Sequence, residues 1–153
     1  MIHSYKNYFD SIFATMKNNN PILIVEDDAD DCEFILSALN ELGVKNEKKC
    51  FSNGKDALAY LKSSHLETFV ILSDVNMPLL NGLQLKAEIN QDDYLRRKSI
   101  PFVFLSTSTS KKEVEAAYDL MAQGYFKKPN SFDEIKTMLK MVTDYWDTAN
   151  HPG

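Results

Sequence analysis

The sequence predicts an α/β fold in which helices cover both faces of a parallel sheet, and two observations support this prediction. From Pro21 onward, short apolar runs alternate five times with segments of helical periodicity, as in a chain that adds one strand and one helix at a time. The runs are short and rich in β-branched residues, which is typical of strands buried on both sides. The predicted strands are residues 22–25, 48–51, 69–72, 100–105 and 124–129.

The helices between the strands are predicted from caps and apolar stripes. Asp30 offers an N-cap with Glu33 three residues later, and Gly43 closes that helix. Two capping boxes, residues 110–113 and 131–134, start the last two helices. The polar stretch 91–99 is predicted to be a surface loop. The predicted buried stripes are Phe34, Ile35, Ala38, Leu39 and Leu42; Val114, Ala117, Tyr118 and Met121; and Ile135, Met138, Leu139, Val142 and Tyr145.

Composition and charge exclude several classes of protein. The chain has 153 residues, of which 44% are apolar and 25% charged, as in one globular domain. A formal charge of -5 argues against nonspecific nucleic-acid binding, which needs a basic face. We find neither a membrane-spanning run nor a secretory signal, so a cytoplasmic protein without membrane contact is expected. Cys32 and Cys50 have no metal-binding spacing and are expected to be reduced thiols.

Acidic residues follow two of the predicted strands at the point where each strand ends. Glu26, Asp27 and Asp28 come directly after the first strand, and Asp74 comes two residues after the third apolar run. Ligands of open α/β sheets bind beyond the carboxyl ends of the strands. Acids delivered there by two strands would form an oxygen-rich pocket suited to a hard cation.

With these acids in place, residues 21 to about 147 resemble the receiver domain of two-component response regulators. The resemblance implies a (βα)5 flavodoxin-like three-layer sandwich with strand order 2-1-3-4-5 and its switch point between strands one and three. The segments that carry it, in order, are Glu26-Asp27-Asp28, Asp74-Val75-Asn76-Met77-Pro78, Asn81-Gly82, Ile100-Pro101 through Leu105-Ser106, and Lys128-Pro129.

The resemblance implies a phosphoryl acceptor and a magnesium site. Asp74 is the expected acceptor, and because an aspartate has an ordinary pKa of about 4, it is ionised at neutral pH and needs no general base. By resemblance, Asp27 and Asp74 ligate Mg2+ directly, the Asn76 carbonyl adds an oxygen, and Glu26 acts through water. The alternative for this acidic cluster is a solvated, helix-capping turn, which suits Asp28 and Asp30 better than Glu26 and Asp27.

Three further residues have roles implied by the resemblance. Lys128 is expected to pair with Asp74 at rest and with a phosphoryl oxygen after transfer, and the peptide bond to Pro129 is expected to be cis. Ser106 matches the switch hydroxyl, with Thr107 as its rival. Tyr125 matches the switch aromatic, for which a static tyrosine is the alternative.

The ends of the chain depart from the receiver pattern. Residues 1–20 carry apolar residues at helical spacing before an Asn-rich linker, which predicts an additional N-terminal amphipathic helix. The alternative is that the native chain begins near Met16. The predicted domains are therefore residues 1–20, the receiver at 21–147, and a tail at 148–153. The apolar positions of the N-terminal segment are Ile2, Tyr5, Phe9, Ile12 and Met16.

The sequence therefore predicts a single-domain response regulator, a phosphorylation-controlled interaction switch or phosphorelay intermediate rather than a metabolic enzyme. The expected partners are a sensor histidine kinase or histidine phosphotransfer protein, a downstream target, and a second copy through the fourth helix, fifth strand and last helix or through the N-terminal helix. Nucleic acid is not expected. A haloacid-dehalogenase-like aspartyl phosphatase is the enzymatic alternative, but that family requires an aspartate at the position where this chain has Asn76. A flavodoxin would want a phosphate loop in place of the acids after strand one.

Overall fold

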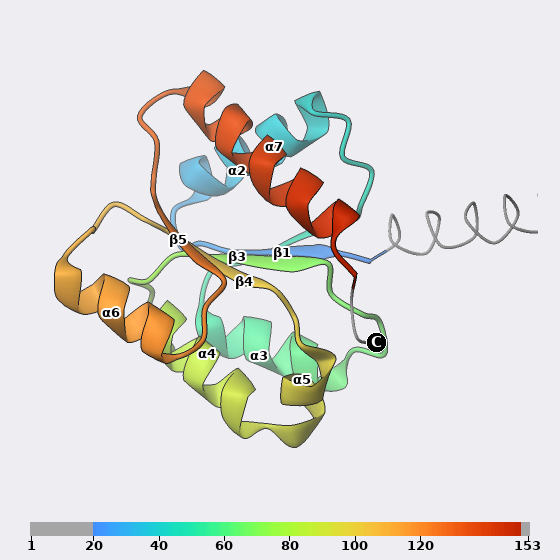
Figure 1. Ribbon diagram of the computed structural model, residues 1–153, viewed down its shortest axis with the longest axis vertical. Helices are drawn as coiled ribbons and strands as arrows, with labels where there is room; N and C mark the ends of the chain where they lie inside the picture. The colour runs from blue at the N-terminus through green and yellow to red at the C-terminus, as the bar shows by residue number, and fades with distance from the viewer. Residues whose placement is uncertain (1–19, 151–153) are drawn as a thin grey trace, which may run out of the picture.

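The computed structural model describes residues 20–150, which form one parallel sheet between two layers of helices (Figure 1). The strand order is β2-β1-β3-β4-β5, and the predicted flavodoxin-like sandwich is confirmed. β2 lies at one edge, as its mixed sequence indicates. The strands are β1 (Ile22–Val25), β2 (Lys48–Phe51), β3 (Val70–Ser73), β4 (Phe102–Ser106) and β5 (Gly124–Lys127).

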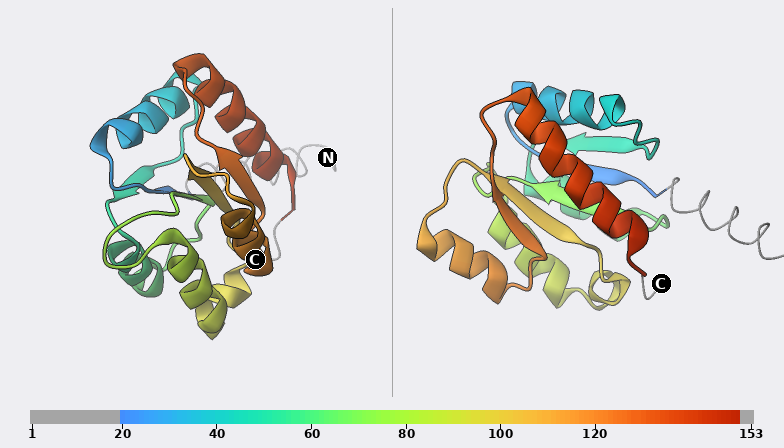
Figure 2. Two further views of the ribbon diagram at one scale, coloured as in Figure 1. Left: turned by 90° about the vertical axis from the view of Figure 1, so that its left-hand side faces the viewer. Right: turned by 45° about the horizontal axis from the view of Figure 1, so that its top comes forward.

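Six helices cover the sheet in the described part of the chain. Helices α2 and α7 lie side by side on one face, and the other four cover the opposite face (Figures 1 and 2). Between residues 20 and 150, none of these helices combines the length and the apolar composition needed to cross a bilayer. Their bounds are α2 (Ala29–Glu41), α3 (Gly54–Ser63), α4 (Gly82–Gln91), α5 (Asp93–Lys98), α6 (Lys111–Asp119) and α7 (Phe132–Thr148).

Strand β1 shows how the sheet divides the core into two layers. Ile22 and Ile24 pack with the α2–α7 layer, whereas Leu23 and Val25 pack with the layer of α3 and α4. All four side chains are fully buried, because successive side chains of a strand point to opposite faces and both faces are covered. This burial holds the carboxyl end of β1 in place against its neighbours.

Two local predictions for the helices are wrong. The N-cap of α2 is Asp28 rather than Asp30, and its side chain accepts hydrogen bonds from the amides of Asp30 and Asp31. The stretch predicted as a loop contains α5, which Asp92 caps and a fully buried Leu95 anchors. One buried leucine in six residues is too short a pattern for periodicity to reveal.

Four residues of the predicted buried stripes are substantially exposed. They are 49–73% exposed, whereas the stripe positions Ile35, Ala117 and Val142 are buried. Three of the exposed four lie at or near helix ends, where the covering surface stops; in α6 only Ala117 is buried. The apolar stripe is therefore wider than the surface that covers it. The four exposed residues are Phe34, Tyr118, Met121 and Tyr145.

The cysteines and the chain ends also differ from expectation. Cys32 on α2 and Cys50 on β2 form a disulfide, so the prediction of reduced thiols is wrong; their contact depends on how α2 lies over β2, which spacing alone does not show. The predicted N-terminal helix lies outside the described residues. Helix α7 continues to Thr148, one residue into the predicted tail.

Candidate functional site

The pairing of β1 with β3 brings the predicted acids together. Val25 is the register partner of Ser73, and the Asp74 amide donates to the Val25 carbonyl over 2.9 Å. The next residues of both strands therefore emerge side by side. Carboxylate oxygens of Glu26, Asp27 and Asp74 all lie within 4.8 Å of one another, at the carboxyl edge of the sheet, where ligands of this architecture bind.

Glu26 is the buried member of this group, with 5% of its surface exposed. Its amide donates to the Phe51 carbonyl of β2 over 2.9 Å, and its Oε1 atom accepts from the Asp28 amide over 3.1 Å. Burial raises the pKa of Glu26 to about 7, and the charge of Asp74 adds to the shift, against hydrogen bonds from Lys128 and Asp28 that lower it. The fold therefore holds a carboxyl that needs a compensating positive charge.

Asp74 is held by the loop that follows β3. Its Oδ1 atom accepts from the Val75 amide over 2.7 Å, while Oδ2 faces Lys128. The loop turns back tightly, because the Gly82 amide donates to the Val75 carbonyl over 2.8 Å. A Cβ atom on Gly82 would lie 2.0 Å from the Asp74 carbonyl oxygen, so a residue without a side chain is required at this approach.

Lys128 brings one ammonium to three carboxylates. Its Nζ atom lies 2.6 Å from Glu26 Oε2, 2.9 Å from Asp31 Oδ2 and 3.3 Å from Asp74 Oδ2, and 14% of its side chain is exposed. Burial alone would lower the pKa of Lys128, but the hydrogen bonds to Glu26 and Asp31 and the charge of Asp74 together raise it. The ammonium therefore stays charged. The peptide bond to Pro129 is trans, so the cis prediction is wrong.

Ser106 is the last residue of β4 and Tyr125 lies on β5, and both contact Ser108 in the β4–α6 loop. Ser106 is fully buried; its Oγ atom accepts from the Ser108 amide over 3.2 Å, and its carbonyl accepts from the Lys128 amide over 2.8 Å. The Tyr125 hydroxyl donates to the Ser108 carbonyl over 2.6 Å. Burial raises the pKa of this phenol. The β4–α6 loop is therefore tied both to the end of β4 and to β5. Thr107, the rival of Ser106, is exposed.

Two residues near the site need separate comment: Asn76, which was predicted to bind the cation, and Asp31, which was not predicted to be part of the site. Asn76 is exposed in the loop after Asp74, and the placing of its carbonyl toward a cation stays a prediction. Asp31 was not singled out as a site residue, yet it contacts Lys128 across 97 residues of sequence. The available signal was its position four residues before Ile35, which is on the buried stripe; an acid on that stripe lies on the side of α2 that faces the fold.

The donor set fits a hard divalent cation. Carboxylate oxygens are the ligands that Mg2+ and Mn2+ prefer, and Glu26, Asp27 and Asp74 supply three within 4.8 Å. Glu26 is buried and Asp27 exposed, so the cluster is anchored in the fold and open to solvent on one side. A cation bound by these carboxylates would therefore be fixed by the protein on one side and could bind a ligand from solvent on the other.

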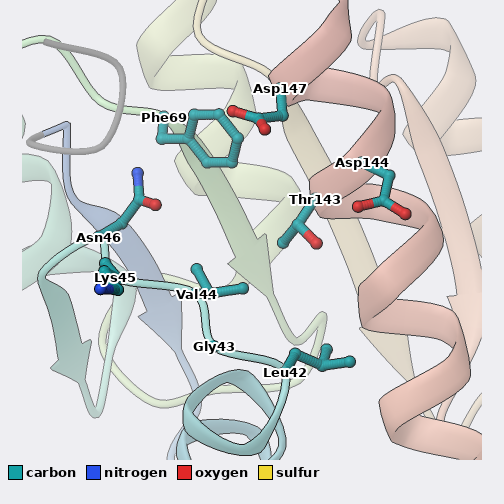
Figure 3. Close-up of a pocket in the computed structure, with 9 residues that line it drawn as sticks. All are labelled: Leu42, Gly43, Val44, Lys45, Asn46, Phe69, Thr143, Asp144 and Asp147. Atoms are coloured by element: carbon teal, nitrogen blue, oxygen red, sulfur yellow. The ribbon is translucent and has the colours of Figure 1, made fainter. Parts of the chain in front are cut away.

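A second hollow lies at the opposite end of the sheet (Figure 3). Its volume is about 310 Å3, and it lies between the loop that precedes β2, the start of β3 and the last turns of α7. It opens at the amino ends of the parallel strands, whereas ligands of such sheets bind at the carboxyl ends. The acids after β1 and β3 therefore mark the better candidate site.

Comparisons with known proteins agree with this geometry. The family profile described as the response regulator receiver domain matches residues 22–140. The probable methanogenesis regulatory protein FilR2 of Methanothrix harundinacea is 32% identical over 130 residues, covering 82% of each chain.

Two solved structures are also similar. The phosphorylated cyanobacterial phytochrome response regulator RcpA has a TM-score of 0.78 at 31% identity, covering 88% of this chain and 99% of its own. The Mn2+-bound form of response regulator Rcp1 has a TM-score of 0.75 at 29% identity, with the same coverage of the two chains. With its strand order, its acidic cluster and a family match over most of its length, this chain belongs to the response regulator receiver domain family.

Proposed function

We propose that this chain is a single-domain response regulator, a switch that accepts a phosphoryl group on Asp74 in a reaction that requires Mg2+. Its family acts in two-component signalling. The observation that carries the proposal is the position of Asp74, within 4.8 Å of the Glu26 and Asp27 carboxylates and 3.3 Å from the Lys128 ammonium. The proposed nucleophile, the candidate cation site and a positive charge thus meet at the carboxyl edge of the sheet.

Repulsion is the obstacle that this arrangement reduces. An ionised Asp74 and an anionic phosphoryl donor about 4 Å apart repel by roughly 4 kcal/mol at an effective dielectric near 20. Bound Mg2+ supplies the positive charge that offsets this repulsion. Asp27 and Asp74 would hold it directly, with the Asn76 carbonyl as a third ligand and Glu26 acting through water. Lys128 supplies a second positive charge beside Asp74.

The transfer forms one bond and breaks one. A carboxylate oxygen of Asp74 forms the new bond to phosphorus, while the bond from phosphorus to the donor's imidazole nitrogen breaks and its electron pair stays on that nitrogen. Lys128 then donates a hydrogen bond to a phosphoryl oxygen. Hydrolysis by water returns Asp74 to a free carboxylate, so the protein acts as a reversible phosphoacceptor rather than as a metabolic enzyme.

Ser106 and Tyr125 are proposed to transmit the change. The buried Ser106 hydroxyl can donate to a phosphoryl oxygen. Such a movement would alter its contact with the Ser108 amide, in the loop that the Tyr125 hydroxyl also holds. A local event at Asp74 thereby reaches the β4–α6 loop and β5.

One proposed partner supplies the phosphoryl group to this switch, and another binds the protein in response. A sensor histidine kinase or histidine phosphotransfer protein would supply the phosphoryl group, which implies a cytoplasmic protein. A target protein or a second copy would bind the face of α6, β5 and α7, where Tyr118, Met121 and Tyr145 are exposed. A hollow of about 330 Å3 between β5 and α7 adds to this face.

Two similar proteins favour this function. RcpA is phosphorylated in its crystal structure, and Rcp1 binds Mn2+ in its own. By contrast, we find no observation that favours the aspartyl phosphatase alternative: the residue two positions beyond Asp74 is Asn76, an exposed amide that cannot act as a general acid.

A phosphorylation assay with acetyl phosphate and Mg2+ tests the proposal. The wild-type chain is expected to gain one phosphoryl group, seen by intact-mass spectrometry and removed by mild base. Asp74→Asn should gain none. Asp28→Asn is the matched control, because Asp28 is an exposed N-cap that asparagine can replace, and it should be phosphorylated normally. Phosphorylation of the Asp74→Asn chain, or none in the wild type, would refute the assignment.

A further inference from the structure

An acid outside the predicted site shares the ammonium of Lys128. Asp31 lies in the first turn of α2, where its amide is capped by the Asp28 side chain over 3.1 Å. Its own carboxylate points to Lys128, with Oδ2 2.9 Å from Nζ. The contact is shorter than that between Lys128 and Asp74, at 3.3 Å. The Lys128 ammonium, which is expected to pair with Asp74, therefore lies closer to Asp31 on α2 than to Asp74.

The hydrogen-bonding capacity of Lys128 is already filled. An ammonium has three N–H donors and no acceptor, and three carboxylates lie within reach, those of Glu26, Asp31 and Asp74. A phosphoryl oxygen that bonds to Lys128 must therefore displace or share one of these three partners.

Asp31 is the partner that phosphorylation does not otherwise engage. Asp74 carries the phosphoryl group, and Glu26 faces the cation cluster. Asp31 is not one of the three residues of that cluster; with Lys128 it lines a small hollow between α2 and α7. Its side chain is 39% exposed, and a helical backbone holds it in place.

We propose that Asp31 is a positioning residue that competes with the phosphoryl group for Lys128. In the resting protein it holds the ammonium to one side of Asp74; in the phosphorylated protein it withdraws part of the hydrogen bonding from the phosphoryl oxygen. Asp31 thereby limits the stability and the lifetime of the phosphorylated state. This inference rests on the proposed function, since it assigns Asp31 to the same site.

Fluoroberyllate, a phosphoryl mimic, measures the competition at saturating Mg2+. Asp31→Asn is expected to bind it about five-fold more tightly and to lose phosphate from Asp74 more slowly, a change comparable to about 1 kcal/mol for one partly exposed charged pair. Asp31→Glu keeps the charge and should return the affinity toward that of the wild type. Asp30→Asn is the matched control, because Asp30 is adjacent, exposed and loses the same charge; it should leave affinity and lifetime unchanged.

A second measurement does not depend on phosphorylation. The NMR signal of the Lys128 side-chain ammonium should change in resting Asp31→Asn and stay as in the wild type in Asp30→Asn. The inference is overturned if Asp31→Asn leaves the signal unchanged, binds fluoroberyllate no more tightly than the wild type, or matches Asp30→Asn throughout. A wild-type chain that accepts no phosphate would instead refute the proposed function, while the ammonium signal would still report on the resting contact.

Discussion

The Nζ atom of Lys128 lies 2.6 Å from Glu26 Oε2, closer than the 3.3 Å that separates it from Asp74 Oδ2. Glu26 is also the more buried of these two carboxyls: its side chain is 3% exposed, against 11% for Asp74. In this site the lysine is therefore first the counter-ion of Glu26 and only second that of Asp74. A divalent cation held by the acidic cluster would take over part of that role.

Replacing Lys128 by methionine should lower the stability of the metal-free protein. The substitution leaves the Glu26, Asp31 and Asp74 carboxylates without their shared positive charge, and losing one partner of a buried ion pair costs about 3 kcal/mol or more. Urea unfolding measures the loss. Added Mg2+ should recover more stability in the variant than in the wild type. Lys127→Met, an exposed neighbour, is the control, and equal losses in the two variants would contradict the prediction.

The stability of the metal-free protein should fall as the pH rises from about 5 to 8. Burial raises the pKa of Glu26 from 4.5 to about 7, so the fold favours the protonated carboxyl. This contribution is fully present below pH 4.5 and is lost as the pH passes through 7; its size is on the order of 3 kcal/mol. Urea unfolding across this pH range should give a flatter profile for Glu26→Gln, whereas exposed Glu67→Gln should follow the wild type. If the stability of the wild type and of Glu26→Gln changed with pH in parallel, Glu26 would not be the source of the pH dependence.

Gly82→Ala should destabilise the protein and displace Asp74. The added Cβ would lie 2.0 Å from the Asp74 carbonyl oxygen, so backbone must move, at a cost of about 3 kcal/mol. Gly43→Ala is the comparison, because Gly43 has a φ of 74° but open space around the new Cβ, and only left-handed backbone strain of about 1 kcal/mol is expected. Denaturant unfolding should rank the two in this order, and fluoroberyllate binding should be lost only in Gly82→Ala. The reverse order would mean that the close approach does not constrain the loop.

Tyr125→Phe should loosen the loop after β4. The hydroxyl donates to the Ser108 carbonyl over 2.6 Å, and its loss costs about 1 kcal/mol. Faster amide hydrogen exchange in residues 107–110 should accompany the loss of stability. Tyr94→Phe removes a similar bond, from the hydroxyl to the Ser64 carbonyl over 3.1 Å at an exposed position, and should cost less. Unchanged exchange in the β4–α6 loop would argue against a switch role for Tyr125.

The parallel sheet and the meeting of the acids were predictable from local patterns in the sequence, whereas the strand order was predicted only through the family resemblance. The apolar runs identify buried strands, and Glu26, Asp27 and Asp74 follow two of them directly. Since parallel strands end at the same edge, their contact needed no knowledge of side-chain packing. The roles assigned to Asp74, Lys128, Ser106 and Tyr125 came with the family resemblance and stay predictions to be tested.

Other features depend on packing between distant segments, which local patterns do not encode. The Asp31–Lys128 contact and the Cys32–Cys50 disulfide are both set by how α2 lies over the sheet. The exposure of Tyr118 depends on where the covering surface ends. Helix α5 escaped prediction because a single buried residue, Leu95, anchors it.

The lysine that balances the acids follows the last strand of the sheet. Glu26 and Asp74 are in place after β1 and β3, but their ammonium arrives only when β5 pairs with β4 and the Lys128 amide reaches the Ser106 carbonyl. During synthesis from the N-terminus, a chain that ends before β5 carries the carboxylates without their counter-ion. The positive charge that balances Glu26 and Asp74 is therefore in place only when the sheet is complete.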